Sequence, residues 1–238
     1  MIQPLTSPIE CLRSEFIRRI TSLGVQRLYL PSLCTKKPDE PAVPILITPA
    51  KDLRQRKRVL VVVNDSVQDL GFWAYRRLTG EDGLYDGSAI SLVKELIRRS
   101  RNHINITSPS GLTDELDDRK NKPQPACEDD AFGIVILNSG QLRYSHRYKK
   151  AMTATTWSAL PRPSLLHDEV VFDSNENTVP GNRDTEEHTK FVFHTIINNP
   201  DFVSSDAKVY AIGIEAGAHA LLHFLNQECK QQSSASHG

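Results

Sequence analysis

The segment Gly213–Gly217 holds the residues of this chain that are best placed to do chemistry. It reads Gly-Ile-Glu-Ala-Gly, and Glu215 follows an apolar run of strand-forming residues and precedes a stretch with helical spacing. A carboxylate can act as a nucleophile, and the N-terminus of a helix stabilises its ionised form. His219 and His223 follow four and eight positions later, so they share one face of the expected helix with Glu215. The spacing allows a nucleophilic carboxylate or a metal-binding stripe.

A metal site explains this stripe less well than packing or the polarity of a helix surface does. Zinc enzymes that bind their metal on a helix commonly use H-E-x-x-H, and this motif is absent from the chain. A P-loop and the dinucleotide-binding pattern G-x-G-x-x-G are absent too. The sequence therefore predicts neither a metal nor a cofactor.

The small residues around Glu215 resemble the nucleophile elbow of α/β-hydrolases, which has the pattern G-x-S-x-G between a strand and a helix. Gly213, Ala216 and Gly217 are small because the backbone must turn sharply there and the helix must pack close to the sheet. Glu215 stands where the hydrolytic form has serine. We therefore expect the scaffold of a hydrolase without its usual nucleophile.

A hydrolase of this type also needs an acid and a histidine on loops after later strands. Only nine residues follow Cys229, and His237 is the one histidine among them. His219 and His223 lie on the elbow helix itself and do not reach round to the elbow carboxylate as a triad base does. We expect a domain that is truncated, or one that completes its sheet with another chain, with an unpaired edge near Val209–Ile214.

Apolar runs alternate with helical patterns along most of the chain, which predicts an α/β fold with a three-layer, mostly parallel and hydrolase-like sheet. One of the helices is capped by Asp184 or Thr185 and ends at Asn199. The other main elements are the strands Val59–Val63, Phe132–Leu137 and Val209–Ile214 and the helices Ser88–Arg101 and Ala216–Cys229.

The first 50 residues predict a separate extension. A helix is expected over Ser7–Leu23, and short strands over Val25–Leu30 and Ile45–Thr48, with prolines between these two strands. We divide the chain into the extension 1–50, an α/β domain over 51–229 and a disordered polar tail over 230–238. Within the domain, residues 113–130 are charged and punctuated by proline, so they predict a flexible insertion.

Polar residues follow two of the expected strands directly, where α/β proteins build their sites. Asn64, Asp65 and Ser66 come after the first strand, in the position of an oxyanion-hole loop, and Asn138 and Ser139 come after the second. Without a nucleophile, the first of these loops is better explained as a structural turn or a binding surface.

The overall charge predicts no anionic partner, because 29 basic residues balance 29 acidic ones. One local segment mixes bases with aromatic residues, as surfaces that contact phosphates and stacked bases do. Its basic side chains are Arg143, Arg147, Lys149 and Lys150. A solvated loop whose long side chains lie along the surface explains the segment better, so contact with nucleic acid is the weaker alternative.

The cysteines indicate a reduced, intracellular setting. Cys11, Cys34, Cys127 and Cys229 lie far apart and form no C-x-x-C pair. No apolar run has the length of about 20 residues that spans a bilayer. The N-terminus lacks the layout of a signal peptide. We expect an intracellular protein without a membrane partner.

Five segments in this order and spacing resemble the domain of Argonaute-binding protein 2, the Arb2-like family, which is also appended to some class II histone deacetylases. The segments are RVLVVVNDSVQDLGFWAYR, LYDGS, FGIVILNSGQL, PGNRDTEEHTKFVFHTII and KVYAIGIEAGA. The resemblance implies an α/β-hydrolase-like fold and a role in chromatin silencing in the nucleus, with subunits of a silencing complex as protein partners. Some members keep the elbow serine, whereas this chain has Glu215, and it contains no deacetylase catalytic domain.

These observations predict a non-catalytic interaction module on a hydrolase-like scaffold. Its partners would be silencing-complex subunits or a chain that completes the sheet. Two alternatives stay open: a divergent hydrolase that uses Glu215, and an inactive truncated fragment. A base within reach of Glu215 would distinguish the hydrolase from the interaction module.

Overall fold

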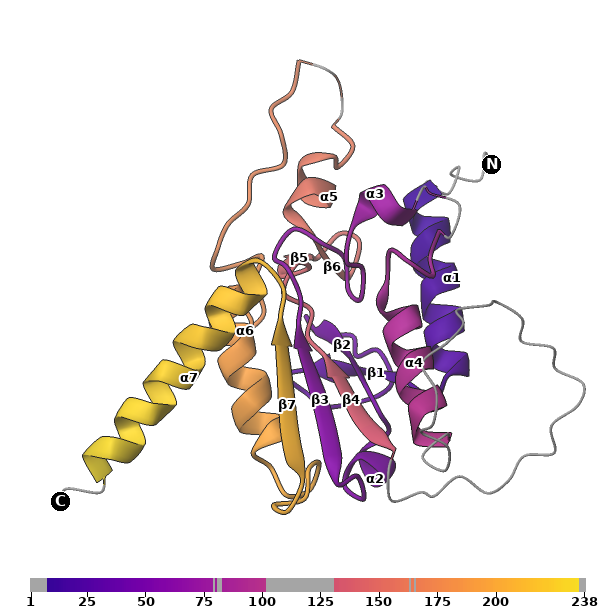
Figure 1. The fold of residues 1–238 in the computed structure, drawn as a ribbon. Helices are drawn as coiled ribbons and strands as arrows, with labels where there is room; N and C mark the ends of the chain where they lie inside the picture. The colour runs from indigo at the N-terminus through magenta and orange to yellow at the C-terminus, as the bar shows by residue number, and fades with distance from the viewer. Residues whose placement is uncertain are drawn as a thin grey trace, which may run out of the picture.

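Five strands form one central sheet in the computed structural model, which describes residues 8–78, 80, 83–101, 131–162, 164 and 166–235 (Figure 1). The order of the strands across the sheet is β1-β2-β4-β3-β7. Their bounds are β1 Gln26–Leu30, β2 Val43–Ile47, β3 Arg58–Val63, β4 Phe132–Ile136 and β7 Lys208–Gly213. The predicted insertion 113–130 lies outside the described residues.

The sheet is mixed, which corrects the expectation of a mostly parallel one. Strands β4, β3 and β7 are parallel, as the alternation of strands and helices predicted. Strand β2 joins β4 in the antiparallel sense, and β1 joins β2 in the same sense. The short strands near the N-terminus therefore extend the same sheet, and their connection through prolines is too short to carry the crossover that a parallel pair needs. The α/β class is confirmed.

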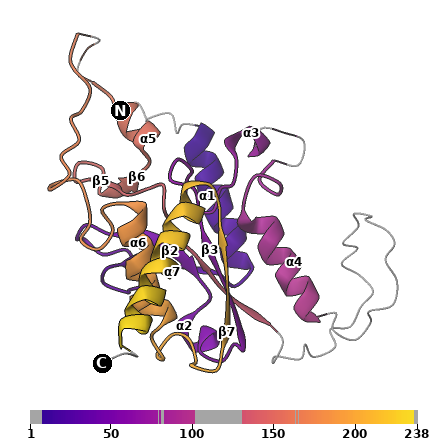
Figure 2. The same ribbon diagram turned by 60° about the vertical axis from the view of Figure 1, so that its left-hand side comes forward.

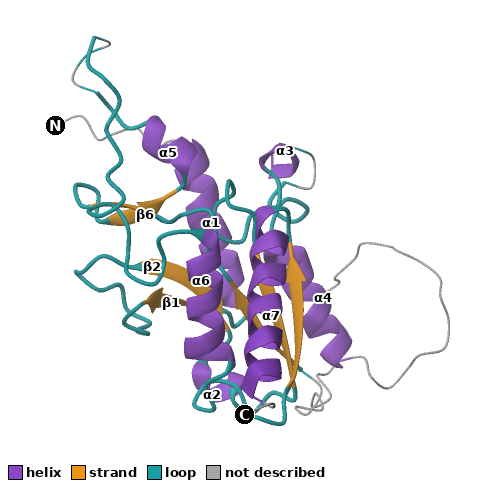
Figure 3. Ribbon diagram, turned by 90° about the vertical axis from the view of Figure 1, so that its left-hand side faces the viewer, coloured by secondary structure: helices purple, strands orange, loops and turns teal. Residues whose placement is uncertain are grey.

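Helices cover both faces of the sheet, so the molecule has three layers (Figures 1, 2 and 3). Helices α1 (Pro8–Ser22) and α4 (Ala89–Arg101) lie on one face. Helices α6 (Thr185–Val192) and α7 (Ala216–Ala235) lie on the other face.

Strand β3 explains why both faces are covered. Val59, Val61 and Val63 are buried in the hydrophobic cluster under α6 and α7, whereas Leu60 and Val62 are buried in the cluster under α1 and α4. Successive side chains of a strand point to opposite faces, so an unbroken apolar run requires cover on both.

The helix boundaries follow the predicted signals at several ends. The side chain of Asp184 accepts a hydrogen bond from the backbone of Glu187 at the start of α6, and Ser88 precedes α4 with its hydroxyl 3.4 Å from the amide nitrogen of Ile90. A π-helical turn (Phe193–Ile197) continues α6 to within two residues of the predicted end at Asn199. One end differs from prediction, because α7 continues through Ala235, beyond the predicted end at Cys229.

Smaller elements lie at the ends of β3 and β4, with α2 (Ala50–Leu53) at their amino ends and the others at their carboxyl ends (Figure 1). Strands β5 (Arg143–Ser145) and β6 (Lys150–Met152) form a hairpin from the basic segment that was predicted as a loop. Three short helices complete the described part of the chain: α2 (Ala50–Leu53), α3 (Tyr75–Leu78) and α5 (Ala154–Ser158). None of the helices in the described ranges is both long enough and apolar enough to cross a membrane. Cys11, Cys34 and Cys229 form no disulfide.

Strand β7 lies at an edge of the sheet and pairs with β3 alone among the described strands. Its apolar side chains are unusually exposed: Val209 at 41%, Tyr210 at 47% and Ile212 at 43%. The expected unpaired edge near Val209–Ile214 is therefore present in the described part of the chain.

The cap of α6 can be tested by replacing Asp184 with alanine. We expect Asp184→Ala to lower the free energy of unfolding by about 1 kcal/mol, because the amide of Glu187 loses its acceptor. Chemical denaturation measures the change. Asp206→Ala, on an exposed turn, is the control; an equal loss in both variants would contradict a specific cap.

Candidate functional site

The turn between β7 and α7 has the strained geometry of a nucleophile elbow. Glu215 adopts φ 49°, in the left-handed region that side chains other than glycine rarely occupy. Its side chain is exposed at the turn. The backbone therefore presents residue 215 outward from a sharp strand-to-helix turn, which is the geometry of the elbow pattern.

Close backbone contacts explain the small residues beside Glu215. A Cβ atom on Gly217 would lie 2.3 Å from the carbonyl oxygen of Val63 and 2.4 Å from that of Asn64. A Cβ atom on Gly213 would lie 2.3 Å from the Cα atom of Ala218. Helix α7 thus begins directly against the end of β3, and no larger residue fits at either glycine.

The two histidines of the predicted stripe face α6 instead of the elbow carboxylate. The Nδ1 atom of His223 lies 3.1 Å from a carboxylate oxygen of Glu186, and Nδ1 of His219 lies 3.7 Å from the other. An open hollow of about 500 Å³ lies beside them, lined by Asp184, Thr185, Glu186, Ala216, His219 and Ala220. Within the described ranges, Glu215 has no hydrogen bond to a histidine that could act as a base.

The same stripe offers no metal site. No group of three or more His, Cys, Asp or Glu side chains in the part of the chain that the structure describes is arranged to hold a metal ion. Glu186 contacts both histidines, but the stripe is exposed on the helix surface. The contacts tie α6 to α7, which is a structural role.

The loop after β3 is organised by Asn64, which is fully buried. Its amide nitrogen donates hydrogen bonds to the carbonyl oxygens of Asp69 and Phe72, at 3.2 and 3.0 Å. The neighbouring Asp65 accepts a hydrogen bond from the amide of Ser66. These contacts hold the backbone of the loop in place.

The loop after β4 is fixed in a similar way by Asn138. Its side chain donates to the carbonyl oxygen of Pro44 and to Gln141, and its backbone amide donates to Nε2 of His188. The carbonyl oxygen of Ser139 accepts from Thr185 at 3.5 Å. The loops after β3 and β4 therefore contact the elements around them, and their buried amides are used to hold the backbone.

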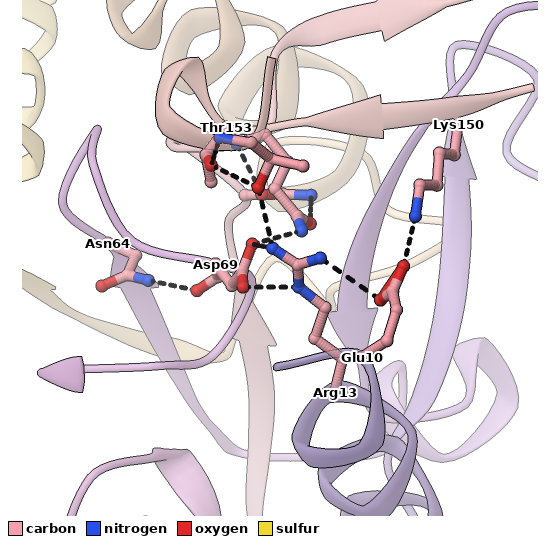
Figure 4. A network of polar contacts seen from close by, with 9 residues as sticks. Glu10, Arg13, Asn64, Asp69, Lys150 and Thr153 are labelled. Carbon is pink, nitrogen blue, oxygen red and sulfur yellow. Dashed lines mark hydrogen bonds and ion pairs between the residues drawn. The ribbon is translucent and has the colours of Figure 1, made fainter. Parts of the chain in front are cut away.

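A network of polar side chains joins these loops to the N-terminal helix (Figure 4). Arg13 of α1 donates to both carboxylate oxygens of Asp69, at 2.6 and 3.0 Å, and to the hydroxyl of Thr156. Gln141 donates to Asp69 at 2.7 Å. Glu10 pairs with Arg13 and with Lys150 of β6. Segments far apart in the chain thus meet at one carboxylate.

Burial gives this network its strength. The side chain of Asp69 is 2% exposed and that of Arg13 is 18% exposed. Burial alone would lower the pKa of Arg13, but the hydrogen bond and charge of Asp69 raise it above its usual value. Burial and the neighbouring Asp69 carboxylate raise the pKa of Tyr75. Arg13 therefore keeps its charge in the folded protein.

The four basic residues for which phosphate contact was the weaker alternative have different partners in the structure. Arg143 lies over the ring of Phe172 and Arg147 lies over the ring of Tyr148. Lys150 pairs with Glu10 and lies with Lys149 at a second hollow. The packing of the two arginines on aromatic rings is consistent with long side chains that lie along the protein surface.

The Arb2 domain matches residues 7–237, which is nearly the whole chain and includes the N-terminal helix and strands. The chain belongs to the Arb2 domain family. This membership suggests a domain related to chromatin silencing. A comparison with curated proteins found no match, and a comparison with solved structures found none either.

Sequence reasoning missed the residues that hold this Arb2 domain together at the carboxyl ends of its strands. Arg13 lies within the helix expected over Ser7–Leu23, and no functional or structural role was predicted for Asp69. His188 is fully buried, with Nδ1 2.6 Å from the side-chain oxygen of Asn182. A charged residue among the apolar positions of a helix was the available signal for Arg13, but nothing in the sequence identified its partner.

The ion pair can be tested through its carboxylate. We expect Asp69→Asn to lower the free energy of unfolding by about 2–4 kcal/mol, because the mostly buried Arg13 loses its buried counter-charge and keeps only the more exposed Glu10. Glu15→Gln is the control. Glu15 is likewise a carboxylate paired with arginine, but its two partners, Arg18 and Arg19, lie at the protein surface. Denaturant titration compares the variants, and equal, small losses would contradict a central role for Asp69.

The buried histidine predicts a dependence of stability on pH. Burial lowers the pKa of His188 to about 3, so the unfolded chain binds a proton below about pH 6.5 that the folded chain does not. Stability is therefore fully present above that pH and falls, by at most about 1.4 kcal/mol per pH unit, as the pH decreases toward 3.

We expect His188→Gln to reduce this slope between pH 6.5 and pH 5, as measured by denaturation at several pH values. His167→Gln removes an exposed histidine and should leave the slope unchanged. A wild-type slope in the His188 variant would show that other groups cause the dependence.

Proposed function

We propose that this chain is a non-catalytic protein-interaction module of a chromatin-silencing complex, and that its partner adds a strand to the free edge of β7. The exposed apolar edge of β7 carries this proposal. Val209, Tyr210 and Ile212 are all more than 40% exposed, and Lys208 is the single charge of the strand. Edge strands that avoid pairing are usually short, charged or covered, so an uncovered apolar edge suits strand addition.

The hydrogen-bonding pattern of β7 defines which groups a partner would use. The amides of Lys208 and Ile214 donate to carbonyl oxygens at the two ends of β3, at 2.8 and 3.0 Å. Alternate residues of a strand direct their backbone groups to opposite sides, so the amides of Val209, Ala211 and Gly213 point away from β3. Helix α7 lies beside β7 and exposes Leu222 and Leu225, which offer further apolar surface (Figure 3).

The family to which the chain belongs indicates what class of partner it would bind. An Argonaute-binding domain family suits association with proteins, and subunits of a silencing or small-RNA complex are the partners that the resemblance implies. This role would place the chain inside the cell, in the nucleus or the cytoplasm.

Proline at position 211 tests the edge directly. Ala211→Pro removes an outward amide and keeps the hydrogen bonds to β3, so we expect the fold to persist and strand addition to fail. The tagged chain would be purified from the cells that express it, with and without the substitution. We expect silencing-complex subunits with the wild type and a roughly tenfold lower recovery with the variant, because strand addition depends on these main-chain hydrogen bonds.

The matched control is Val171→Pro, which places a proline in an exposed extended segment away from β7. It should retain the partners. Equal recovery with Ala211→Pro would mean that β7 is not the interaction surface, once thermal melting has shown both variants to be folded.

A divergent hydrolase is the second candidate, because Glu215 is exposed at an elbow with φ 49° beside an open hollow. The purified chain would be screened against ester substrates together with Glu215→Gln. Turnover that the substitution abolishes would favour the hydrolase; we expect no turnover from either, because Glu215 has no base within hydrogen-bond distance among the described residues.

A further inference from the structure

A second hollow, of about 220 Å³, lies between the β5–β6 hairpin and strand β1. It is built from two stretches of the chain, residues 27–44 and 144–151, that lie about one hundred positions apart in the sequence. Strand β1 and the connection to β2 form one side, and the turn and second strand of the hairpin form the other. The polar residues that line the hollow are Arg27, Tyr29, Lys37, Glu40, Tyr144, Lys149 and Lys150.

The lining is strongly basic. Four cations face one carboxylate, that of Glu40. Lys150 pairs with Glu10, but Arg27, Lys37 and Lys149 form no ion pair with any carboxylate in the described ranges. Such a cluster of unneutralised cations raises the local concentration of anions. Lys149 also adopts φ 48°, an uncommon conformation for a lysine, in the turn that carries it.

Two tyrosines line the hollow with their aromatic rings, and each ring carries a polar hydroxyl group. Tyr29 is 6% exposed and Tyr144 is 3% exposed, and both line the hollow. Within the described part of the chain, neither hydroxyl has a hydrogen-bond partner. Burial and the nearby Asp39 raise the pKa of Tyr144, so its hydroxyl stays protonated and able to donate. Pro38 and Pro44 line the same hollow.

The size of the hollow limits what it can hold. Pockets for whole drug-sized ligands have volumes of about 300–1,000 Å³, so this one suits a single charged group and part of a ring. A phosphate monoester carries nearly two negative charges at neutral pH and three strong acceptor oxygens. Those features match three unpaired cations and two hydroxyl donors.

We propose that this hollow is a binding site for a phosphate monoester on a ring-bearing small molecule, such as a nucleoside monophosphate. Arg27, Lys37 and Lys149 bind the phosphate oxygens, and the tyrosine and proline wall contacts the ring. The site lies on the hairpin side of the sheet, away from β7. It therefore does not depend on the interaction proposed for that edge.

Calorimetric titration of the full chain tests the site with four probes: inorganic phosphate, adenosine monophosphate, adenosine, and an oligonucleotide without terminal phosphates. We expect adenosine monophosphate to bind most tightly and adenosine not to bind. Affinity should fall as salt is added, because the contacts are ionic. It should also fall from pH 7.5 to pH 5.5, as the phosphate with its second pKa near 6 gains a proton.

Lys149→Gln and Arg27→Gln should each weaken binding by about tenfold or more, because each removes a charge-assisted hydrogen bond. Both side chains are exposed and outside the core, so the variants should fold, and thermal melting checks this. Arg147→Gln is the matched control: it lies in the same hairpin and is equally basic, but it packs on Tyr148 and does not line the hollow. It should bind as the wild type does.

Three outcomes would overturn the proposal. The first is no binding of inorganic phosphate or adenosine monophosphate at millimolar concentration. The second is an equal loss in Arg147→Gln, which would mean that general surface charge attracts the anion. The third is equal affinity for the oligonucleotide, whose phosphates are diesters; this would make the surface a contact for a nucleic-acid backbone. Binding that survives Ala211→Pro would separate this site from the β7 edge.

Discussion

The buried carboxylate of Asp69 is the constraint on which the arrangement of the loops in this Arb2 domain depends. A carboxylate that is 2% exposed needs charged and hydrogen-bonding partners, because burial without them costs several kcal/mol. Arg13 and Gln141 satisfy it, and Asn64 binds the carbonyl oxygen of the same residue. Helix α1 and the loops after β3 and β4 are therefore fixed by one group.

The same constraint fixes the backbone of those loops. The side-chain amides of Asn64 and Asn138 donate to carbonyl oxygens of the loop after β3 and of β2. The turn between β7 and α7 has a strained backbone and approaches β3 closely, while His219 and His223 contact α6. The turn thus acts as a structural joint between β7 and α7.

The two edges of the sheet differ in what covers them. The β1 edge is followed by the proline-rich connection and the β5–β6 hairpin, which together enclose a basic hollow. The β7 edge pairs with β3 alone in the described part of the chain and exposes apolar side chains. An edge of this kind favours a macromolecular partner, whereas an enclosed basic hollow favours a small anion. The two proposals therefore concern separate surfaces.

The sequence by itself determined the elements and the elbow. Unbroken apolar runs identified β3, β4 and β7, cap residues such as Asp184 located helix ends, and Gly213 and Gly217 indicated a sharp turn, because these signals are local in the chain. Tertiary structure alone decided the antiparallel pairing of β2 with β4, the meeting of Arg13 with Asp69, and the hollow between Arg27 and Lys149. These contacts join residues about 50 to 120 positions apart, and their stability comes from burial, which no local pattern of residue types records.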